Sequence, residues 1–184
     1  MISRVAVAAV LLAVLLAGFL YESLVVIPVL LISILGVVCY YELAQMFEPQ
    51  GVRMSRRIGV ALVLGLALLG WEKNLADSYL FVGLAMALAF VWRMRIDPLE
   101  GSWRDISATV AGVAYIGLPI ATVVELFVRN EETRAFLLLM FTVAWFGDTF
   151  AMLAGKKYGK RKIFPRLSPG KTWEGCVGGL LGAM

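Results

Sequence analysis

Residues 145–179 read WFGDTFAMLAGKKYGKRKIFPRLSPGKTWEGCVGG, and the predicted fold is built outward from this stretch. It begins as an apolar helix with a single acid, Asp148, and continues into a segment from Lys156 to Lys171 that contains seven cations and no acid. It then passes through Ser168 and Pro169 into a second apolar helix. A carboxylate at membrane depth costs at least about 2.5–3.5 kcal/mol, so Asp148 is a candidate functional residue. A carboxylate beside a basic segment has the chemistry of a phosphate site that uses a divalent metal ion.

The composition is that of a membrane protein. Of 184 residues, 61% are hydrophobic, and the mean hydropathy is +0.85. The apolar residues fall in long blocks, which favours a polytopic α-helical protein over a barrel. The sequence has no His, and its two cysteines, Cys39 and Cys176, lie in separate apolar blocks, which argues against a zinc site or a disulfide framework. The net charge of +4 needs no nucleic-acid partner, because the cations lie between apolar segments.

The apolar blocks predict six transmembrane helices and the start of a seventh within a single membrane domain, 1–184. Residues 1–154 hold the six helices, residues 155–172 form a basic cytoplasmic loop, and residues 173–184 are an incomplete helix. A cleaved signal peptide is the alternative for the first block. The predicted spans are Val5–Leu20, Leu24–Phe47, Ile58–Trp71, Leu75–Trp92, Ile106–Val128 and Ala135–Ala154.

The charges predict the orientation. With six crossings, fourteen of the 17 Lys and Arg residues fall on one side, and Lys73, Arg129 and Arg134 fall on the other. Because cations are enriched in cytoplasmic loops, the N-terminus and the basic segment are predicted to be cytoplasmic.

Three local features carry further expectations. The span Ile58–Trp71 corresponds to only about 21 Å of helix, so it either extends into the two preceding arginines or is re-entrant. Pro119 predicts a kink in the fifth span, because its ring removes a backbone donor. The loop Arg93–Asp105 has mixed charges, and we expect a solvated turn there. Glu42, near the end of the second span, is either a helix-end acid or a site residue.

Gly170, Lys171 and Thr172 resemble the end of a P-loop, but the earlier glycine of that motif is replaced by Pro165 and no strand is predicted before it. Instead, Ser168 is a suitable N-cap and Pro169 a suitable first helical residue, so we expect the last helix to begin there. Lys171 and Thr172 would then lie in a first turn that favours an anion. The alternative is a capped helix with a snorkelling lysine.

Helical periodicity places Asp148 on one face with Met152 and Gly155, within two turns of the predicted cytoplasmic end of its helix. A magnesium ion binds one or two carboxylates together with substrate phosphates and water, which suits Asp148. Glu174 is the local candidate for a second carboxylate, although a first-turn acid is also explained by the helix dipole. The alternative for Asp148 is neutralisation by a structural Arg or Lys.

These residues resemble the middle of the bacterial phosphatidate cytidylyltransferase (CDP-diglyceride synthetase) family. That family has an Asp-Ser/Thr-x-Ala motif at the end of a membrane helix, then a Gly-basic segment, then S-P-x-K-T-x-E-G and a pair of glycines. In this sequence residues 148–151 read DTFA, residues 155–160 read GKKYGK, residues 168–175 read SPGKTWEG, and residues 178–179 are both Gly. Met152 departs from the family, which often has an aromatic residue there. The specific resemblance is confined to residues 148–179, and the upstream spans match only in number and hydrophobicity.

The resemblance implies transfer of a cytidylyl group from CTP to phosphatidate, giving CDP-diacylglycerol and pyrophosphate, with Mg²⁺ as cofactor. It implies a multi-pass protein of the bacterial inner membrane, an active site facing the cytoplasm, and a homodimer. The chain corresponds to the N-terminal two-thirds of such an enzyme, so we expect further metal-binding acids in the remaining part and no activity from these 184 residues alone. The implied site residues are Asp148 (catalytic and metal-binding), Lys171 (catalytic), and Ser168, Thr172, Lys156, Lys160 and Glu174 (substrate-binding).

Two other functions are compatible with the residues. A small transporter could use Asp148 as its coupling acid, since intramembrane acids and broken helices are typical of transporters. A non-catalytic membrane assembly subunit is the other alternative. Protection of Lys171 from chemical labelling by CTP, or ion flux in proteoliposomes, would discriminate between enzyme and transporter.

Overall fold

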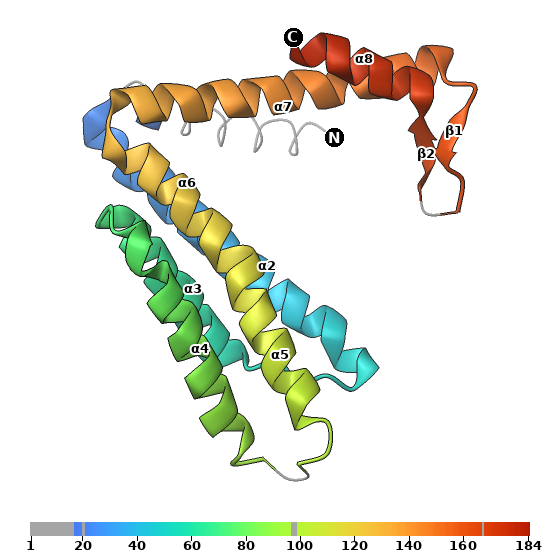
Figure 1. Cartoon of the computed structure of the whole chain (residues 1–184). Coiled ribbons are helices and arrows are strands. Elements are labelled where there is room, and N and C mark those ends of the chain that lie inside the picture. The colour runs from blue at the N-terminus through green and yellow to red at the C-terminus, as the bar shows by residue number, and fades with distance from the viewer. Residues whose placement is uncertain (1–16, 20, 97–98, 167) are drawn as a thin grey trace, which may run out of the picture. The chain divides into compact units, whose positions relative to one another are not determined.

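The computed structural model describes residues 17–19, 21–96, 99–166 and 168–184, and the chain divides into two compact units, Met1–Arg134 and Ala135–Met184. The predicted all-α class is confirmed, because nearly all regular structure of the described residues is helical (Figure 1). The helices are α2 (Val26–Phe47), α3 (Arg56–Trp71), α4 (Ser78–Arg93), α5 (Ser102–Gly112), α6 (Leu118–Arg129), α7 (Glu131–Tyr158) and α8 (Trp173–Ala183). The strands are β1 (Lys162–Phe164) and β2 (Ser168–Thr172).

Four helical segments of the described residues are long and apolar enough to cross a membrane. They are Glu22–Gln50, Leu75–Arg93, Ser102–Arg129 and Glu131–Tyr158. The first predicted span, Val5–Leu20, lies outside the described residues except for 17–19. Helix α3 begins at Arg56, so it extends into the two arginines, which was one of the two alternatives for this span. It has only 16 residues. The apolar helices therefore support a membrane protein, while the count of six crossings stays a prediction.

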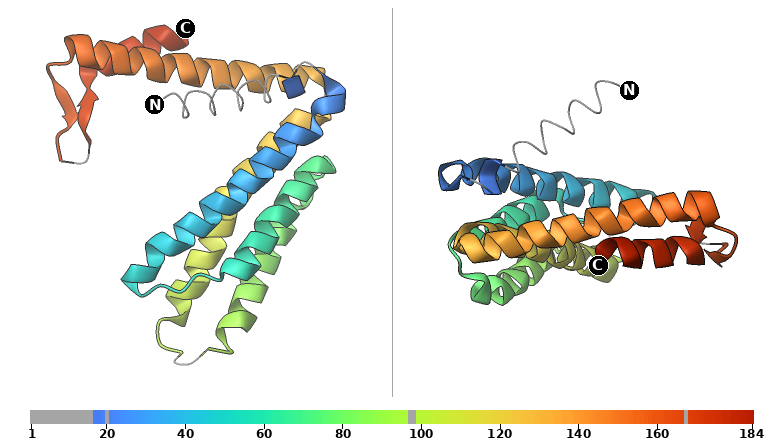
Figure 2. Two further views of the ribbon diagram at one scale, coloured as in Figure 1. Left: turned by 180° about the vertical axis from the view of Figure 1, so that it is seen from behind. Right: turned by 90° about the horizontal axis from the view of Figure 1, so that it is seen from above.

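In the first unit α3 packs against α2, α4 and α6 (Figures 1 and 2). Glycines permit the closest approaches: a Cβ on Gly70 would lie 2.3 Å from the Ala121 carbonyl oxygen, and one on Gly59 would lie 1.9 Å from the Tyr40 ring. Backbones that approach through small residues gain the van der Waals contacts that hold membrane helices together. The core residues of this unit are Tyr40, Ala44, Met54, Leu62, Val63, Leu66, Ala85, Val113 and Ala121.

The helical segment that contains Pro119 is irregular just before the proline, while the predicted kink itself stays a prediction. A π-helical segment, Val113–Gly117, separates α5 from α6 immediately before the proline. Proline has no N–H to donate to the preceding turn, and π-turns are a common way for a helix to absorb such a defect.

In the second unit α7 and α8 lie side by side and are joined by the antiparallel hairpin of β1 and β2 (Figures 1 and 2). Residues 155–172, expected to be a loop, are thus more ordered than predicted: α7 continues to Tyr158, and the hairpin follows.

Candidate functional site

The acid that the sequence singled out lies on α7. Asp148 is exposed within its unit, and among the described residues its carboxylate has no hydrogen-bond or ion-pair partner. The alternative of neutralisation by a structural Arg or Lys therefore finds no support in these residues. At 1.5 Å per residue, Asp148 lies about 10 Å along the helix from Gly155.

Helix α8 packs on α7 through a seam of small residues. A Cβ on Gly178 would lie 2.3 Å from the Ala154 Cβ, and one on Gly175 would lie 3.0 Å from the Ala151 carbonyl oxygen. Gly147 in turn lies closest to Gly179. A Cβ on Gly175 would also lie 3.3 Å from the Gly155 Cα, and one on Gly179 would lie 3.1 Å from the Gly147 carbonyl oxygen, so the contacts advance along α8 while they go back along α7, and the pair is antiparallel. Asp148 follows Gly147 and is rotated by about 100° from it, so it lies on one flank of the seam.

The predicted start of the last helix at Ser168 is wrong. Ser168–Thr172 is strand β2, paired with β1 so that Lys162 faces Thr172 and Phe164 faces Ser168. Helix α8 begins at Trp173 with Thr172 as its N-cap, whose Oγ1 accepts a hydrogen bond from the Gly175 N–H at 3.2 Å. The local capping preference of a Ser-Pro pair was outweighed by pairing with β1, and a threonine four residues later supplies the cap.

Because α8 begins at Trp173, two predicted site residues lie in a strand and not in the first turn of a helix. Lys171 lies in a strand with its side chain exposed, not in a helical first turn. Thr172 is 4% exposed and also lies near Gly155 and Gly159, where its Oγ1 would be 3.2 and 2.9 Å from an added Cβ. Thr172 therefore ties the end of α7 to the start of α8, while Ser168 lies four residues further along the hairpin, about 13 Å away in an extended strand.

Glu174 closes the base of the hairpin. Its carboxylate accepts hydrogen bonds from the backbone N–H groups of Lys160, at 3.1 Å, and Arg161, at 3.3 Å. The Trp173 N–H donates to the Arg161 carbonyl oxygen at 3.0 Å beside it. A hydrogen bond from its own backbone, followed by those from Lys160 and Arg161, lowers the pKa of Glu174 below its usual value. This carboxylate is thus already engaged by the chain, whereas that of Asp148 is not.

The predicted cations lie near the hairpin in the sequence, on the end of α7, between α7 and β1, and on β2. Lys156, Lys160 and Lys171 are all exposed, and none of them forms a salt bridge within the part of the chain that the structure describes. An exposed cluster of unpaired cations produces a positive potential that attracts polyanions. The structure thus brings Thr172, Glu174 and the backbone of Lys160 together, and it leaves Asp148 about two helical turns away along α7.

A magnesium ion would have one free carboxylate here. No group of three or more Cys, Asp or Glu residues suited to a metal occurs among the described residues, and the sequence has no His. Magnesium is commonly held by one or two carboxylates with the remaining positions filled by phosphates and water. Asp148, whose carboxylate has no partner among the described residues, could supply the single carboxylate of such a site. Phosphate oxygens and water would then be the other ligands.

A buried polar network in the first unit was missed by the sequence analysis. The described residues 99–101 of the loop are exposed, as expected of a solvated turn, but the two ends of the loop meet in a buried ion pair. Arg93 Nε lies 2.7 Å from Asp105 Oδ2, and both side chains are under 5% exposed. Asp105 Oδ1 also accepts from the Arg53 N–H at 2.7 Å. Thr109 extends the network, accepting from the Ser55 N–H at 3.1 Å. The ion pair joins the end of α4 to the start of α5, and only the mixed signs of the loop could have suggested it.

The fold and this unit define a class: a protein of several apolar helices, four of them in the described residues long enough to cross a membrane, with an acid on one such helix followed by a cationic hairpin. The sequence matches the Cytidylyltransferase family across residues 2–184, and the chain belongs to that family.

Curated relatives agree with this assignment. The chain is 28% identical over 155 residues to a phosphatidate cytidylyltransferase of Brucella abortus, covering 82% of this chain and 53% of the relative. It is 41% identical over 76 residues to that of Haemophilus influenzae, covering 41% and 24%, and 37% identical over 83 residues to that of Rickettsia conorii, covering 45% and 35%. The chain thus spans between about a quarter and a half of the length of these relatives. No solved structure matches it.

Proposed function

We propose that this chain carries part of the active site of a phosphatidate cytidylyltransferase. In the reaction, a phosphate oxygen of phosphatidate bonds to the α-phosphorus of CTP. The bond from that phosphorus to the bridging oxygen of the β-phosphate breaks, and pyrophosphate leaves with the electron pair. The products are CDP-diacylglycerol and pyrophosphate. The observation that carries the proposal is an unengaged carboxylate, Asp148, on the helix that leads into the cationic hairpin, at the positions of the family motif.

The cations perform the first task, which is binding. Lys156, Lys160 and Lys171 are exposed and unpaired among the described residues, so their charges are available to the triphosphate of CTP. Lys171 would act as a point charge on a phosphate undergoing transfer, and Ser168 would donate its hydroxyl to a phosphate oxygen. Such contacts lower the barrier when they strengthen as charge develops in the transition state.

Thr172 and Glu174 position these groups. Thr172 caps α8 and contacts the end of α7, and Glu174 fixes the backbone of Lys160. The hairpin that carries Lys171 is thereby held at the end of α7. We assign Glu174 to support of the nucleotide site through the backbone and not to direct metal binding.

Asp148 would hold Mg²⁺, which supplies neutralisation of phosphate charge when bound. The residue can do so because its carboxylate is exposed and no cation of the described chain competes for it. The proposal places the protein in the bacterial inner membrane, with this site at the cytoplasmic side and two copies in the working enzyme.

The test is turnover in membranes that contain the protein, measured as CTP- and Mg²⁺-dependent formation of CDP-diacylglycerol. Since the relatives are longer, both the 184-residue chain and the product of the coding DNA read past Met184 are assayed. We expect Asp148→Asn to lower turnover of the active form at least about a hundredfold, which is a loss of about 2.7 kcal/mol, while the protein level persists. Thr142→Val, a hydroxyl removed from the same helix, is the matched control and should keep activity. Near-normal turnover of Asp148→Asn would remove this residue from the mechanism.

A binding test separates nucleotide recognition from turnover. CTP with Mg²⁺ should protect Lys171 from amine-specific labelling, while Lys73, in the other unit, should label equally with and without CTP. Equal labelling of Lys171 under both conditions would contradict its role at the nucleotide.

A further inference from the structure

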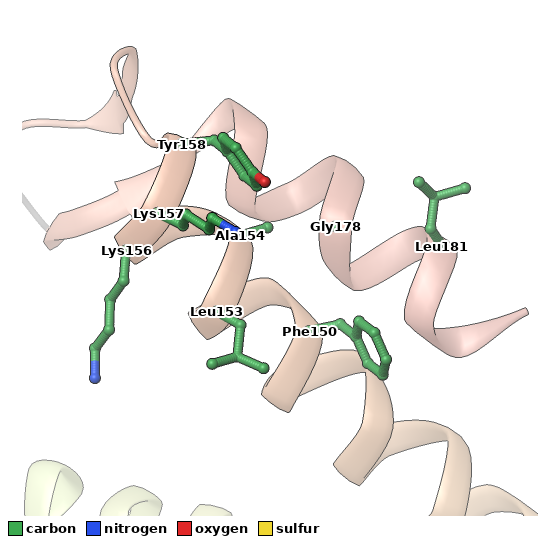
Figure 3. A pocket seen from close by; sticks show the side chains of 8 residues that line it. All are labelled: Phe150, Leu153, Ala154, Lys156, Lys157, Tyr158, Gly178 and Leu181. Atoms are coloured by element: carbon green, nitrogen blue, oxygen red, sulfur yellow. The ribbon is translucent and has the colours of Figure 1, made fainter.

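The second unit contains a groove whose lining includes, of the residues assigned to the reaction above, Lys156 but not Asp148, Ser168, Lys171 or Thr172. It has a volume of about 740 Å³ and lies along α7 and α8. Its apolar part is lined by Phe150, Leu153 and Leu181, and its other end by Lys156, Lys157 and Tyr158. In Figure 3, Lys157 and Tyr158 lie close together at one end, and Phe150 lies toward the other. The groove is thus apolar along its length and cationic at the end of α7.

The groove and Asp148 are on different flanks of the seam. Successive residues of an α-helix are rotated by about 100°, so Phe150 lies about 160° around α7 from Asp148. Phe150, Leu153 and Lys157 share one face by their spacing of three and four residues. Asp148 is not among the residues that line the groove. A molecule in the groove would therefore not present its head to the proposed metal-binding carboxylate.

The polar end of the groove is suited to an anion. The Lys157 Nζ lies 5.3 Å from the centroid of the Tyr158 ring, which holds the ammonium group beside the phenol. An ammonium and a phenolic O–H are both donors to phosphate oxygens. Neither Lys156 nor Lys157 forms a salt bridge to a carboxylate of the described chain. Lys156 extends away from α8 in Figure 3, so Lys157 is the cation closest to the Tyr158 ring.

We propose that this groove binds one anionic phospholipid of the bilayer, separately from the reacting phosphatidate. An acyl chain lies against Phe150, Leu153 and Leu181, and the phosphate accepts hydrogen bonds from Lys157 and Tyr158. The occupant is a lipid because a single surface combines a long apolar wall with a cationic end, and α7 is long and apolar enough to cross the membrane. A water-soluble phosphate would leave the apolar wall uncovered.

The test counts lipids bound to the purified 184-residue chain by native mass spectrometry, after titration with phosphatidylglycerol or phosphatidylcholine. We expect one tightly bound phosphatidylglycerol and several-fold weaker binding of phosphatidylcholine. Removing one cation near a membrane surface weakens anionic-lipid binding by about fivefold. Lys157→Gln should therefore show that loss, whereas Lys162→Gln, an exposed cation of β1 outside the groove, should not.

A second pair of variants tests the apolar wall. Leu181→Trp adds bulk at the groove and should displace the lipid, while Leu180→Trp, an equally exposed neighbour outside it, should leave binding unchanged. Equal losses for Lys157→Gln and Lys162→Gln would mean nonspecific charge attraction and would overturn the proposal. A shift of the monomer–dimer ratio by Leu181→Trp with unchanged lipid count would also overturn it, because the groove would then be a contact between copies. Since no reaction is measured, these outcomes are independent of whether the chain transfers cytidylyl groups.

Discussion

The buried ion pair of the first unit supports the sharpest stability prediction. In Asp105→Asn the side chain keeps its shape and can still accept from the Arg53 N–H, but it loses the charge that faces Arg93. The two side chains are 3% and 4% exposed and 2.7 Å apart, so water cannot replace the lost interaction. Removing one member of such a pair costs about 3–5 kcal/mol. At about 2–4 °C per kcal/mol for a chain of this size, the midpoint of thermal unfolding should fall by about 6–20 °C.

The assay is thermal unfolding of detergent-purified protein, followed by tryptophan fluorescence. The matched control is Glu48→Gln, which removes the carboxylate of an exposed pair with Arg56, where the side chains are 66% and 36% exposed. Exposed pairs contribute at most about 1 kcal/mol, so the control should shift the midpoint by less than about 4 °C. Equal shifts for the two variants would refute the claim that burial makes the first pair important.

A double variant separates the lost pairing from general damage. Arg93→Met together with Asp105→Asn removes both charges and keeps the acceptor for the Arg53 N–H. Because Arg93 and Asp105 bond to each other, the destabilisation of this double variant should be smaller than the sum of the losses in the two single variants. If the destabilisation of the double variant equalled the sum of the losses in Arg93→Met and Asp105→Asn, the two residues would not be coupled and the interpretation would fail.

Three further outcomes follow from local geometry. Thr172→Val removes the cap on the Gly175 N–H and should destabilise the second unit by about 1 kcal/mol, measured as faster amide exchange in α8. The folded-state pKa of Glu174 is lowered, so its contribution to stability is complete above the unfolded value of about 4.3 and is lost as the pH falls through the folded pKa. As the pH falls, the backbone amides of the hairpin should therefore lose less protection from hydrogen exchange in Glu174→Gln than in the unsubstituted protein. If this protection depended on pH in the same way in both proteins, the assignment would be contradicted. Gly70→Ala should lower the unfolding midpoint because its Cβ has no room, whereas Gly83→Ala, with nothing within 4 Å, should leave it unchanged or raise it.

The helices could be predicted because their signal is carried by long runs of the same kind of residue. Burial against lipid or protein requires apolar length, and the predicted spans agree with α2, α4 and α7 to within a few residues at most ends. Asp148 could be singled out for the complementary reason, because a lone acid in such a run is costly and rarely retained without a use. Both inferences depend only on the residues inside one helix.

The features that were missed depend on partners distant in sequence. Ser168 and Pro169 satisfy the local rules for a helix start, but nothing local shows that β1 would pair with this segment or that Glu174 would hold Lys160. Arg93 satisfies the rule for a cation at the end of a membrane helix, and its burial depends on Asp105, twelve residues later. A local capping preference is worth about 1 kcal/mol, whereas leaving one member of a buried ion pair without its partner costs about 3–5 kcal/mol, so partners distant in sequence decide the structure where they meet.

The packing of α8 on α7 through small residues would allow the two proposed roles to share one helix. Small residues on the facing sides let the backbones approach, which leaves both outer flanks of α7 free for functional side chains. One flank carries Asp148 and the other carries Phe150 and Lys157. A substitution in the seam, such as Gly178→Leu, would push α8 away and disturb both flanks together, so it cannot assign a role to either. Asp148→Asn and Lys157→Gln each alter one flank without touching the seam. If each changed only its own readout, turnover for the first and lipid binding for the second, the two flanks would be functionally separate.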